Sequence, residues 1–134
     1  MKKLLSLVLC FLAMISALTI ISSANGTISP YHNNVSTVLT SFEIVNDDTA
    51  TITLKVRGFS GITTKSEIDT TLFVKSGTSW VEVCSWYDES TSFRAIFTHT
   101  SEVESGTYKV FVEYRIYGSG GDADVITYEK ELTN

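Results

Sequence analysis

The sequence predicts an all-β protein, an antiparallel immunoglobulin-like β-sandwich of about seven strands that follows an N-terminal signal peptide. Two observations carry this prediction. Apolar and polar residues alternate with period two through most of the chain, and Thr, Val, Ile, Tyr and Phe, which suit a pleated half-buried surface, are frequent. Turn signals also recur about every ten residues, a spacing typical of sandwiches and barrels.

Residues 1–24 have the three-part layout of a secretory signal peptide. Two lysines precede an apolar run over 4–21, and Ser22 and Ala24 are small residues in the −3 and −1 places of a cleavage site. We expect cleavage after Ala24, a single domain over 25–134, and a secreted, extracellular protein with no stable membrane insertion. A retained anchor is the alternative, because the run is just long enough to span a bilayer.

Four strands are expected in the first half of this domain. STVLTSFEIV is rich in strand-forming residues and ends at the turn residues NDD. TATITLKVRG alternates most regularly, so its aliphatic side chains point one way and its threonines, lysine and arginine the other. SEIDTTLFVKSG repeats the alternation, and SWVEVCSWYD follows a Ser-Gly turn. These strands span residues 36–45, 49–58, 66–77 and 79–88.

Three further strands complete the expected sandwich. TSFRAIFTHT follows the polar turn DES, GTYKVFVEYRIYG is the longest strand, and DVITYEKEL follows the flexible turn GSGGDADV. They span residues 91–100, 106–118 and 124–132. Tyr108 begins the longest strand near the C-terminus, which is the setting of the tyrosine corner of immunoglobulin-like domains. Its phenol should anchor the preceding turn, while Val110 stands where an antibody domain has a cysteine.

Three stretches carry a resemblance to a known family: ISPYHNNVS, LFVKSGTSWVEVCSW and SGTYKVFVEY. Through them the chain resembles a family of short exported proteins from Gram-positive bacteria, known as a domain of unknown function. The resemblance spans most of the mature chain. It implies an exported β-sandwich and supplies no catalytic residues. Neither His32 nor Cys84 is a mark of that family.

Charge and cysteine content narrow the possible partners. Loss of Lys2 and Lys3 leaves 8 basic and 15 acidic residues, a net charge of −7. The sequence shows no run of lysine or arginine, so we expect nucleic acid and anionic lipid to be repelled. Cys84 is then the one remaining cysteine, and it cannot form an internal disulfide. The core must therefore hold the domain together unaided.

The stretch GTSWVEVCSWYDES contains two tryptophans, whose orientation decides its role. Trp80, Cys84 and Trp86 have the same parity, so a regular strand places them on one face. A hairpin turn at DEST would set Trp86 opposite Phe93 and Cys84 opposite Ala95, forming a buried apolar face with a slow-reacting thiol. Two alternatives remain open: a one-residue slip that exchanges the faces, or a location of these strands in different sheets.

No catalytic group stands out, and we expect a protein that is not an enzyme. A thiol enzyme needs a base beside the sulfur, and neither His32 nor His99 falls opposite Cys84 in that register. No G-x-S-x-G elbow indicates a serine hydrolase. The acidic turns NDDT and DAD offer oxygen ligands of the kind calcium prefers, but neither has the spacing of a calcium motif. We expect no catalytic residue, metal or cofactor.

Binding is the remaining class of function. By analogy with other exported sandwiches, we expect a module that binds a protein or cell-surface partner. The alternative is a carbohydrate-binding module that takes up polysaccharide, with aromatic side chains stacking on sugar rings. The candidate stacking residues are Trp80, Trp86, Tyr114, Tyr117 and Tyr128.

Overall fold

A computed structural model describes residues 32–134, so the predicted signal peptide and its cleavage site lie outside the described residues. The described part consists of strands joined by turns and loops, and it contains no helix that could cross a membrane. Each predicted strand overlaps an observed one. The seven strands are β1 (Val35–Val45), β2 (Thr49–Gly58), β3 (Lys65–Ser76), β4 (Ser79–Ser90), β5 (Arg94–Glu102), β6 (Thr107–Tyr117) and β7 (Asp124–Thr133).

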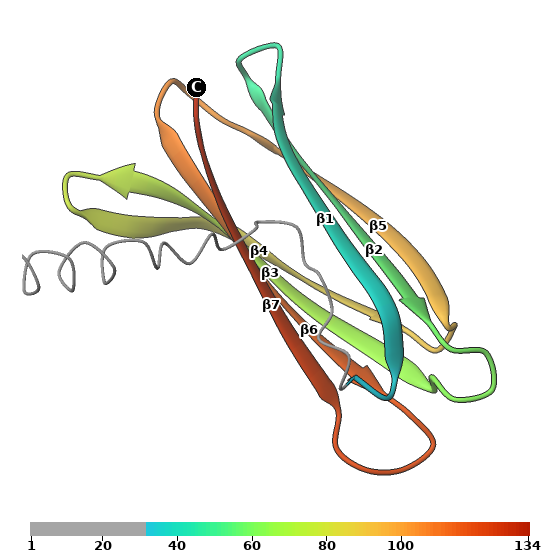
Figure 1. The fold of residues 1–134 in the computed structure, drawn as a ribbon. Helices are drawn as coiled ribbons and strands as arrows, with labels where there is room; N and C mark the ends of the chain where they lie inside the picture. The colour runs from blue at the N-terminus through green and yellow to red at the C-terminus, as the bar shows by residue number, and fades with distance from the viewer. Residues whose placement is uncertain (1–31) are drawn as a thin grey trace, which may run out of the picture.

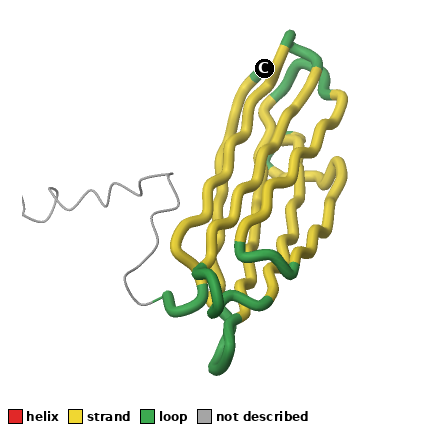
Figure 2. The backbone as a smooth tube through the Cα atoms, turned by 90° about the vertical axis from the view of Figure 1, so that its right-hand side faces the viewer, coloured by secondary structure: helices red, strands yellow, loops and turns green. Residues whose placement is uncertain are grey.

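The strands form two sheets that face each other, as Figures 1 and 2 show from two directions. One sheet has three strands in the order β1-β2-β5, and the other has four in the order β4-β3-β6-β7. Every neighbouring pair is antiparallel. The prediction of a seven-stranded antiparallel β-sandwich is therefore confirmed.

The core lies between the sheets and is made by alternate residues of the central strands. In β2, Ile52 and Leu54 are fully buried, while the neighbouring Thr51 and Thr53 are half-buried on the other side of the sheet. β6 has the same pattern, because its even-numbered residues are buried and its odd-numbered ones are half-buried. Burial of such side chains contributes roughly 1.5–3 kcal/mol each to folding. The period-two pattern thus fixes which face of each central strand is internal.

Tyr114 lies in this core and connects the two sheets. Its side chain is 0% exposed, its hydroxyl lies 2.6 Å from the Thr40 hydroxyl, and it donates a hydrogen bond of 3.4 Å to the Leu39 carbonyl. Burial raises the pKa of Tyr114 to about 12. The prediction that Tyr114 belongs to a ligand-stacking surface is wrong, because alternation along β6 points its ring inward.

Tyr108 makes the contact predicted for it. Its hydroxyl accepts a 3.0 Å hydrogen bond from the backbone N–H of Glu104, in the turn that precedes β6. The ring itself is buried in the core. The phenol therefore anchors the β5–β6 connection to the sandwich.

The predicted hairpin between β4 and β5 is wrong. Cys84 lies opposite Leu72 of β3, and Ala95 lies opposite Val56 of β2, so β4 and β5 belong to different sheets. The tight turn at Gly77, with a φ of 63°, folds β4 back onto β3. β5 consequently crosses to the other sheet and pairs with β2, which was one of the alternatives left open by the sequence.

Candidate binding site

A β-bulge in β4 places its two tryptophans on opposite faces of the four-stranded sheet. Cys84 pairs with Leu72 but Glu82 pairs with Phe73, so one extra residue lies in β4 at this point. An extra residue reverses the alternation of every side chain beyond it. Trp86 therefore faces the other sheet and Trp80 faces outward, and the prediction that they share a face is wrong.

Trp86 is half-buried and packs against the core. Its ring stacks on that of His99, with centroids 4.9 Å apart and an interplanar angle of 13°. His99 Nε2 lies 2.6 Å from Asp88 Oδ2, which fixes the imidazole in place. Cys84 also packs against the core and is half-buried, less than the full burial expected for it. Trp86 is thus engaged by its own chain and offers no flat open platform.

Trp80 lies on the outer face, but two lysines cover its ring. The Lys109 ammonium is 4.6 Å from the ring centroid and that of Lys75 is 5.9 Å away. Lys109 also lies 5.6 Å from the centroid of Phe73. These are cation–π distances, so a sugar ring would have to compete with both ammonium groups for Trp80.

The remaining stacking candidates do not join Trp80 in one surface. Tyr128 is half-buried, packs against the core, and has its pKa raised by that burial. Tyr117 does lie on the outer face, but at the opposite end of the sheet. Trp80 pairs with Lys75 and Tyr117 with Lys65, positions about 33 Å apart along β3 at roughly 3.3 Å per residue. No common aromatic platform results.

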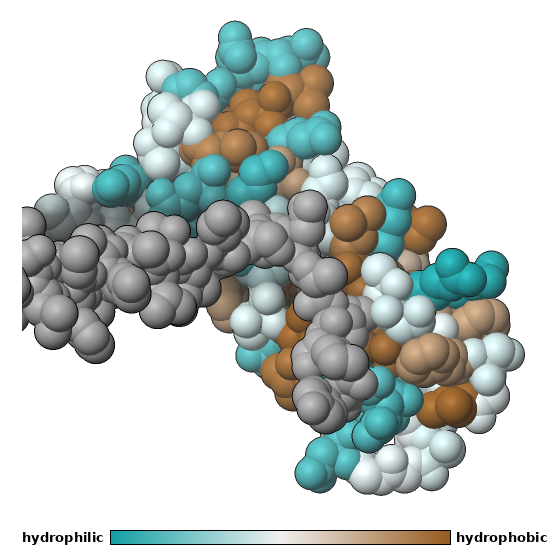
Figure 3. Space-filling model, viewed as in Figure 1, coloured by the Kyte–Doolittle hydropathy of each residue, from teal (hydrophilic) through white to brown (hydrophobic). Residues whose placement is uncertain are grey.

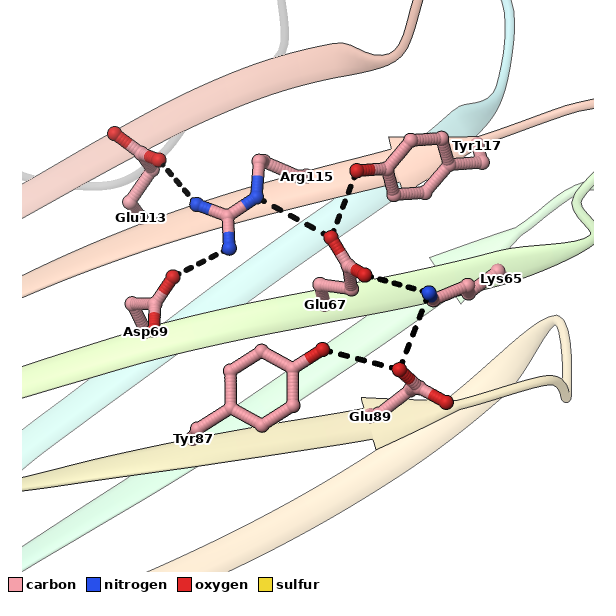
Figure 4. A network of polar contacts seen from close by, with 8 residues as sticks. All are labelled: Lys65, Glu67, Asp69, Tyr87, Glu89, Glu113, Arg115 and Tyr117. Atoms are coloured by element: carbon pink, nitrogen blue, oxygen red, sulfur yellow. Dashed lines mark hydrogen bonds and ion pairs between the residues drawn. The ribbon is translucent and has the colours of Figure 1, made fainter.

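At the end marked by Tyr117, the outer face of the four-stranded sheet carries an ionic network centred on Glu67 (Figure 4). Glu67 receives the Lys65 ammonium at 2.5 Å, the Tyr117 hydroxyl at 2.7 Å and the Arg115 guanidinium at 3.3 Å. The bond from Lys65, followed by that from Tyr117, lowers the pKa of Glu67 to about 2. Glu67 is therefore fully ionised at neutral pH, and its oxygens are already occupied.

The rest of the network balances its charges in the same way. Arg115 donates to Glu113 and Asp69, each at 2.5 Å, and these bonds raise its pKa further. Lys65 also pairs with Glu89 at 3.1 Å, to which Tyr87 donates at 3.0 Å. The acids and bases of this network thus satisfy one another, and none of the cations shown in Figure 4 is left for an external anion.

The outer face of the three-stranded sheet is different, because it contains a hollow of about 510 Å³. Across the strands, Leu39 lies beside Lys55 and Lys55 beside Ile96. Leu39 is 47% exposed and Ile96 67% exposed. Apolar surface also reaches the outside of the molecule as separate patches among hydrophilic groups (Figure 3). The hollow is lined by Thr37, Leu39, Lys55, Val56, Arg57, Arg94, Ala95 and Ile96.

Three cations of this hollow, Lys55, Arg57 and Arg94, form a group that we call the basic cluster. Arg57 lies directly opposite Arg94 in the register, and Lys55 is two residues away on β2. The ion pairs among residues 32–134 involve other cations: His32, Lys65, His99, Lys109 and Arg115. Within that part of the chain, the basic cluster therefore has no acidic partner.

Sequence reasoning missed the basic cluster. Arg94 comes from β5 and the other two cations from β2, and the pairing of these strands brings them together. The one local signal was the alternation of Lys55 and Arg57 around Val56, which puts both cations on the outer side of β2. The sequence has no run of lysine or arginine, and the basic cluster forms only because β2 and β5 pair.

The acidic turns that offered calcium ligands serve the fold. Asp124 is buried, and its carboxylate accepts backbone N–H groups from Asn33, Asn34 and Val35 at 3.4, 2.7 and 3.2 Å. This ties the start of β1 to β7. Asp48 accepts a bond from the neighbouring Thr49 hydroxyl at 2.8 Å. Within residues 32–134, no group of three or more His, Cys, Asp or Glu side chains is placed to hold a metal ion.

No protein-family model matches the chain, and no curated protein matches it. Among solved structures, a protein from Bacteroides fragilis assigned as a β-galactosidase is similar over 72% of this chain, with 16% identity and a TM-score of 0.41. β-Glucosidase 3B from Thermotoga neapolitana is similar over 82%, with 12% identity and a TM-score of 0.40. The matched regions are 16% and 18% of those proteins, less than a fifth of either.

Proposed function

We propose that the chain is an exported, non-enzymatic module that binds an acidic, partly apolar segment of a protein or cell-surface partner at the hollow of its three-stranded sheet. The observation that carries the proposal is the basic cluster, unpaired within the described chain, beside the exposed side chains of Leu39 and Ile96.

The chemistry of the cluster favours carboxylates as its ligands. An arginine guanidinium can donate two parallel hydrogen bonds to one carboxylate, and such charge-assisted bonds are stronger than neutral ones. Arg57 and Arg94 lie side by side on the adjacent strands β2 and β5, so they can bind two neighbouring acidic groups. The flanking aliphatic side chains add apolar area, which gives affinity that salt does not screen. Together they suit a partner that alternates acidic and apolar residues.

Two further features belong to the same proposal. Export is supported by the signal-peptide layout of residues 1–24 and by the resemblance to short exported proteins of Gram-positive bacteria. An immunoglobulin-like form of the sandwich is supported by the hydrogen bond between Tyr108 and the Glu104 backbone, the contact that defines a tyrosine corner. Both fit a module that acts outside the cell.

A peptide-display selection tests the binding proposal. The mature domain, residues 25–134, is immobilised and used to select from a library of random twelve-residue peptides. We expect enrichment of peptides that combine Asp or Glu with aliphatic residues, because both parts of the hollow then find partners. The double variant Arg57→Glu, Arg94→Glu should bind the selected peptides at least tenfold more weakly, a loss of about 1.4 kcal/mol or more.

Lys75→Glu is the matched control, since it reverses a cation on the other sheet, far from the hollow. It should leave peptide binding unchanged. Selected peptides without an acidic preference, or equal binding by the double variant, would contradict the proposal.

Carbohydrate binding is the second candidate, and the outward position of Trp80 is the observation in its favour. We test carbohydrate binding by titrating the domain with cell-wall and plant polysaccharides while following tryptophan fluorescence. The lysines over Trp80 lead us to expect no change. A spectral shift that Trp80→Ala abolishes would favour the carbohydrate reading over a protein partner.

A further inference from the structure

We propose that the partner segment adds to the free edge of β5 as a fourth strand of the three-stranded sheet. This inference rests on the proposed function and specifies how the partner binds. Strand addition uses main-chain hydrogen bonds for affinity and neighbouring side chains for specificity.

The direction of the β5 backbone groups follows from two hydrogen bonds at its ends. The carbonyl of Phe93 accepts from Gly58 N–H at 2.6 Å, and the N–H of Val103 donates to the Asp48 carbonyl at 2.8 Å. Both odd-numbered residues thus point toward β2. Because successive residues of a strand point opposite ways, the even-numbered residues of β5 direct their N–H and C=O groups outward.

The outward backbone groups of Ile96, Thr98 and Thr100 take no part in the ladder to β2, and they make no other hydrogen bond within residues 32–134. These three residues provide three donors and three acceptors in a row. β5 is also regular, since its pairing with β2 has no register shift over nine residue pairs. A straight row of unpaired backbone groups is a template for another strand.

The other edge strands carry features that hinder strand addition. β1 has a bulge near Val35, and side chains occupy two of its carbonyls: Tyr114 donates to Leu39 O, and Lys130 donates to Phe42 O at 3.2 Å.

β4 is interrupted by the bulge at its centre. β7 carries three consecutive charged residues, Glu129, Lys130 and Glu131. Bulges and charges are the usual protections of a sheet edge, and β5 has neither between Arg94 and Glu102.

The side chains along β5 define the chemistry of the added strand. On the outer side, Arg94 and Ile96 would lie beside it, which favours an acidic residue followed two positions away by an apolar one. On the inner side it would pass over Phe97 and toward Trp86, both half-buried. β4 has no fully buried residue, whereas β3 beside it has several. A fourth strand would therefore cover apolar surface that the three-stranded sheet leaves partly open.

A single strand fits this edge better than a second copy of the domain does. Trp86 and Asp88 of β4 reach His99 on the inner side of the edge. A second copy joined through its own β5 would bring its own four-stranded sheet up to this β4. An extended segment brings one layer only.

A synthetic peptide tests the mode of binding. It has nine residues that alternate threonine and valine, with a glutamate designed to lie opposite Arg94 and a lysine opposite Glu102. Two N-methylated forms are made: one is methylated at the three residues opposite Ile96, Thr98 and Thr100, and the other at the residues between them. Strand addition predicts that only one of the two methylated peptides binds more weakly, by at least tenfold. The reason is that only alternate N–H groups of the added strand face β5.

A protein variant gives a second measurement. Thr98→Pro removes a donor that points away from β2, so the ladder is kept and the fold should survive, as proline is tolerated on sheet edges. We expect circular dichroism like that of Thr98→Ala but at least tenfold weaker peptide binding. If Thr98→Pro does not fold, the two methylated peptides decide the matter with the unaltered protein.

The outcomes separate this inference from the proposed function. Glutamate-dependent binding that both methylated peptides retain would place the partner on the face of the sheet, overturning strand addition and leaving the proposed function intact. Absence of peptide binding would overturn strand addition, while the display selection judges the hollow independently. Sedimentation that reveals a dimer lost in Thr98→Pro would identify a second copy as the occupant and also overturn the inference.

Discussion

The outer faces of the two sheets use their charges in opposite ways. On the four-stranded sheet, Lys65 and Arg115 lie within 3.3 Å of the carboxylates that surround them. On the three-stranded sheet, Lys55, Arg57 and Arg94 stand together with no acidic partner in the described chain. The contrast is marked because the chain has 15 acidic residues and only 10 basic ones.

Charges that satisfy one another support the fold and leave little for a ligand. Cations held side by side without a partner repel one another, so they contribute nothing favourable to folding and remain open to an external anion. The three-stranded face is thus the better candidate for function, and the four-stranded face is the better candidate for stability. Three experiments test this division.

The largest expected effect on stability comes from comparing a tryptophan on the inner face of the four-stranded sheet with one on its outer face. Trp86→Ala removes a ring that packs on the core and on His99, and should lower the free energy of unfolding by about 3 kcal/mol. Trp80→Ala removes a ring from the outer face and should cost less than about 1 kcal/mol. Urea denaturation of both variants measures the difference. Equal losses would show that the outer face contributes to stability as the core does.

A second experiment compares one arginine from each outer face. Arg115→Gln leaves Glu67, Asp69 and Glu113 close together without their cation, and should lower the free energy of unfolding by about 1 kcal/mol. Arg57→Gln removes a cation that has no ion pair within residues 32–134, so stability should stay within about 0.5 kcal/mol of wild type. Thermal or urea unfolding at low salt measures both. A larger loss for Arg57→Gln would reverse the assignment of the two faces.

The smallest effect concerns acid pH. The pKa of Glu67 is about 2 in the folded protein and about 4.3 in an unfolded chain. A depressed folded-state pKa stabilises above the unfolded value, and this stabilisation is lost as pH falls from about 4.3 toward about 2. Wild type should therefore exceed Glu67→Gln in stability at pH 6, with the gap narrowing by pH 2.5. Glu102→Gln, which removes an acid outside the network, is the control. A stability difference between wild type and Glu67→Gln that does not change with pH would show that the charge of Glu67 does not stabilise the fold.

Much of the fold follows from residues that are near one another in sequence. Alternation in TATITLKVRG gave β2 with the correct inner face, and GTYKVFVEYRIYG was correctly identified as a strand. Turn residues such as Gly77 separated neighbouring strands correctly, and the setting of Tyr108 predicted a contact that is present. These features are local, because side-chain direction alternates along a single strand and a turn depends on a few residues.

The candidate site was much less accessible to sequence reasoning. Parity put Trp80 and Trp86 on one face, and the bulge in β4 separated them. A bulge depends on how one strand meets its neighbour, and nothing in the residues of β4 alone announces it. Tyr114 was indistinguishable from Tyr117 as an aromatic residue, although one is buried and the other lies in the ionic network.

The sequence by itself determined the all-β class, the number and approximate positions of the strands, and the side of β2 that faces the core. Only the tertiary structure decided that β5 pairs with β2 instead of β4. That choice brings Arg94 beside Arg57, leaves an edge of β5 open and places Trp86 against His99. The physical reason is that alternation acts within one strand, whereas pairing depends on how all seven strands together bury their apolar faces between two sheets.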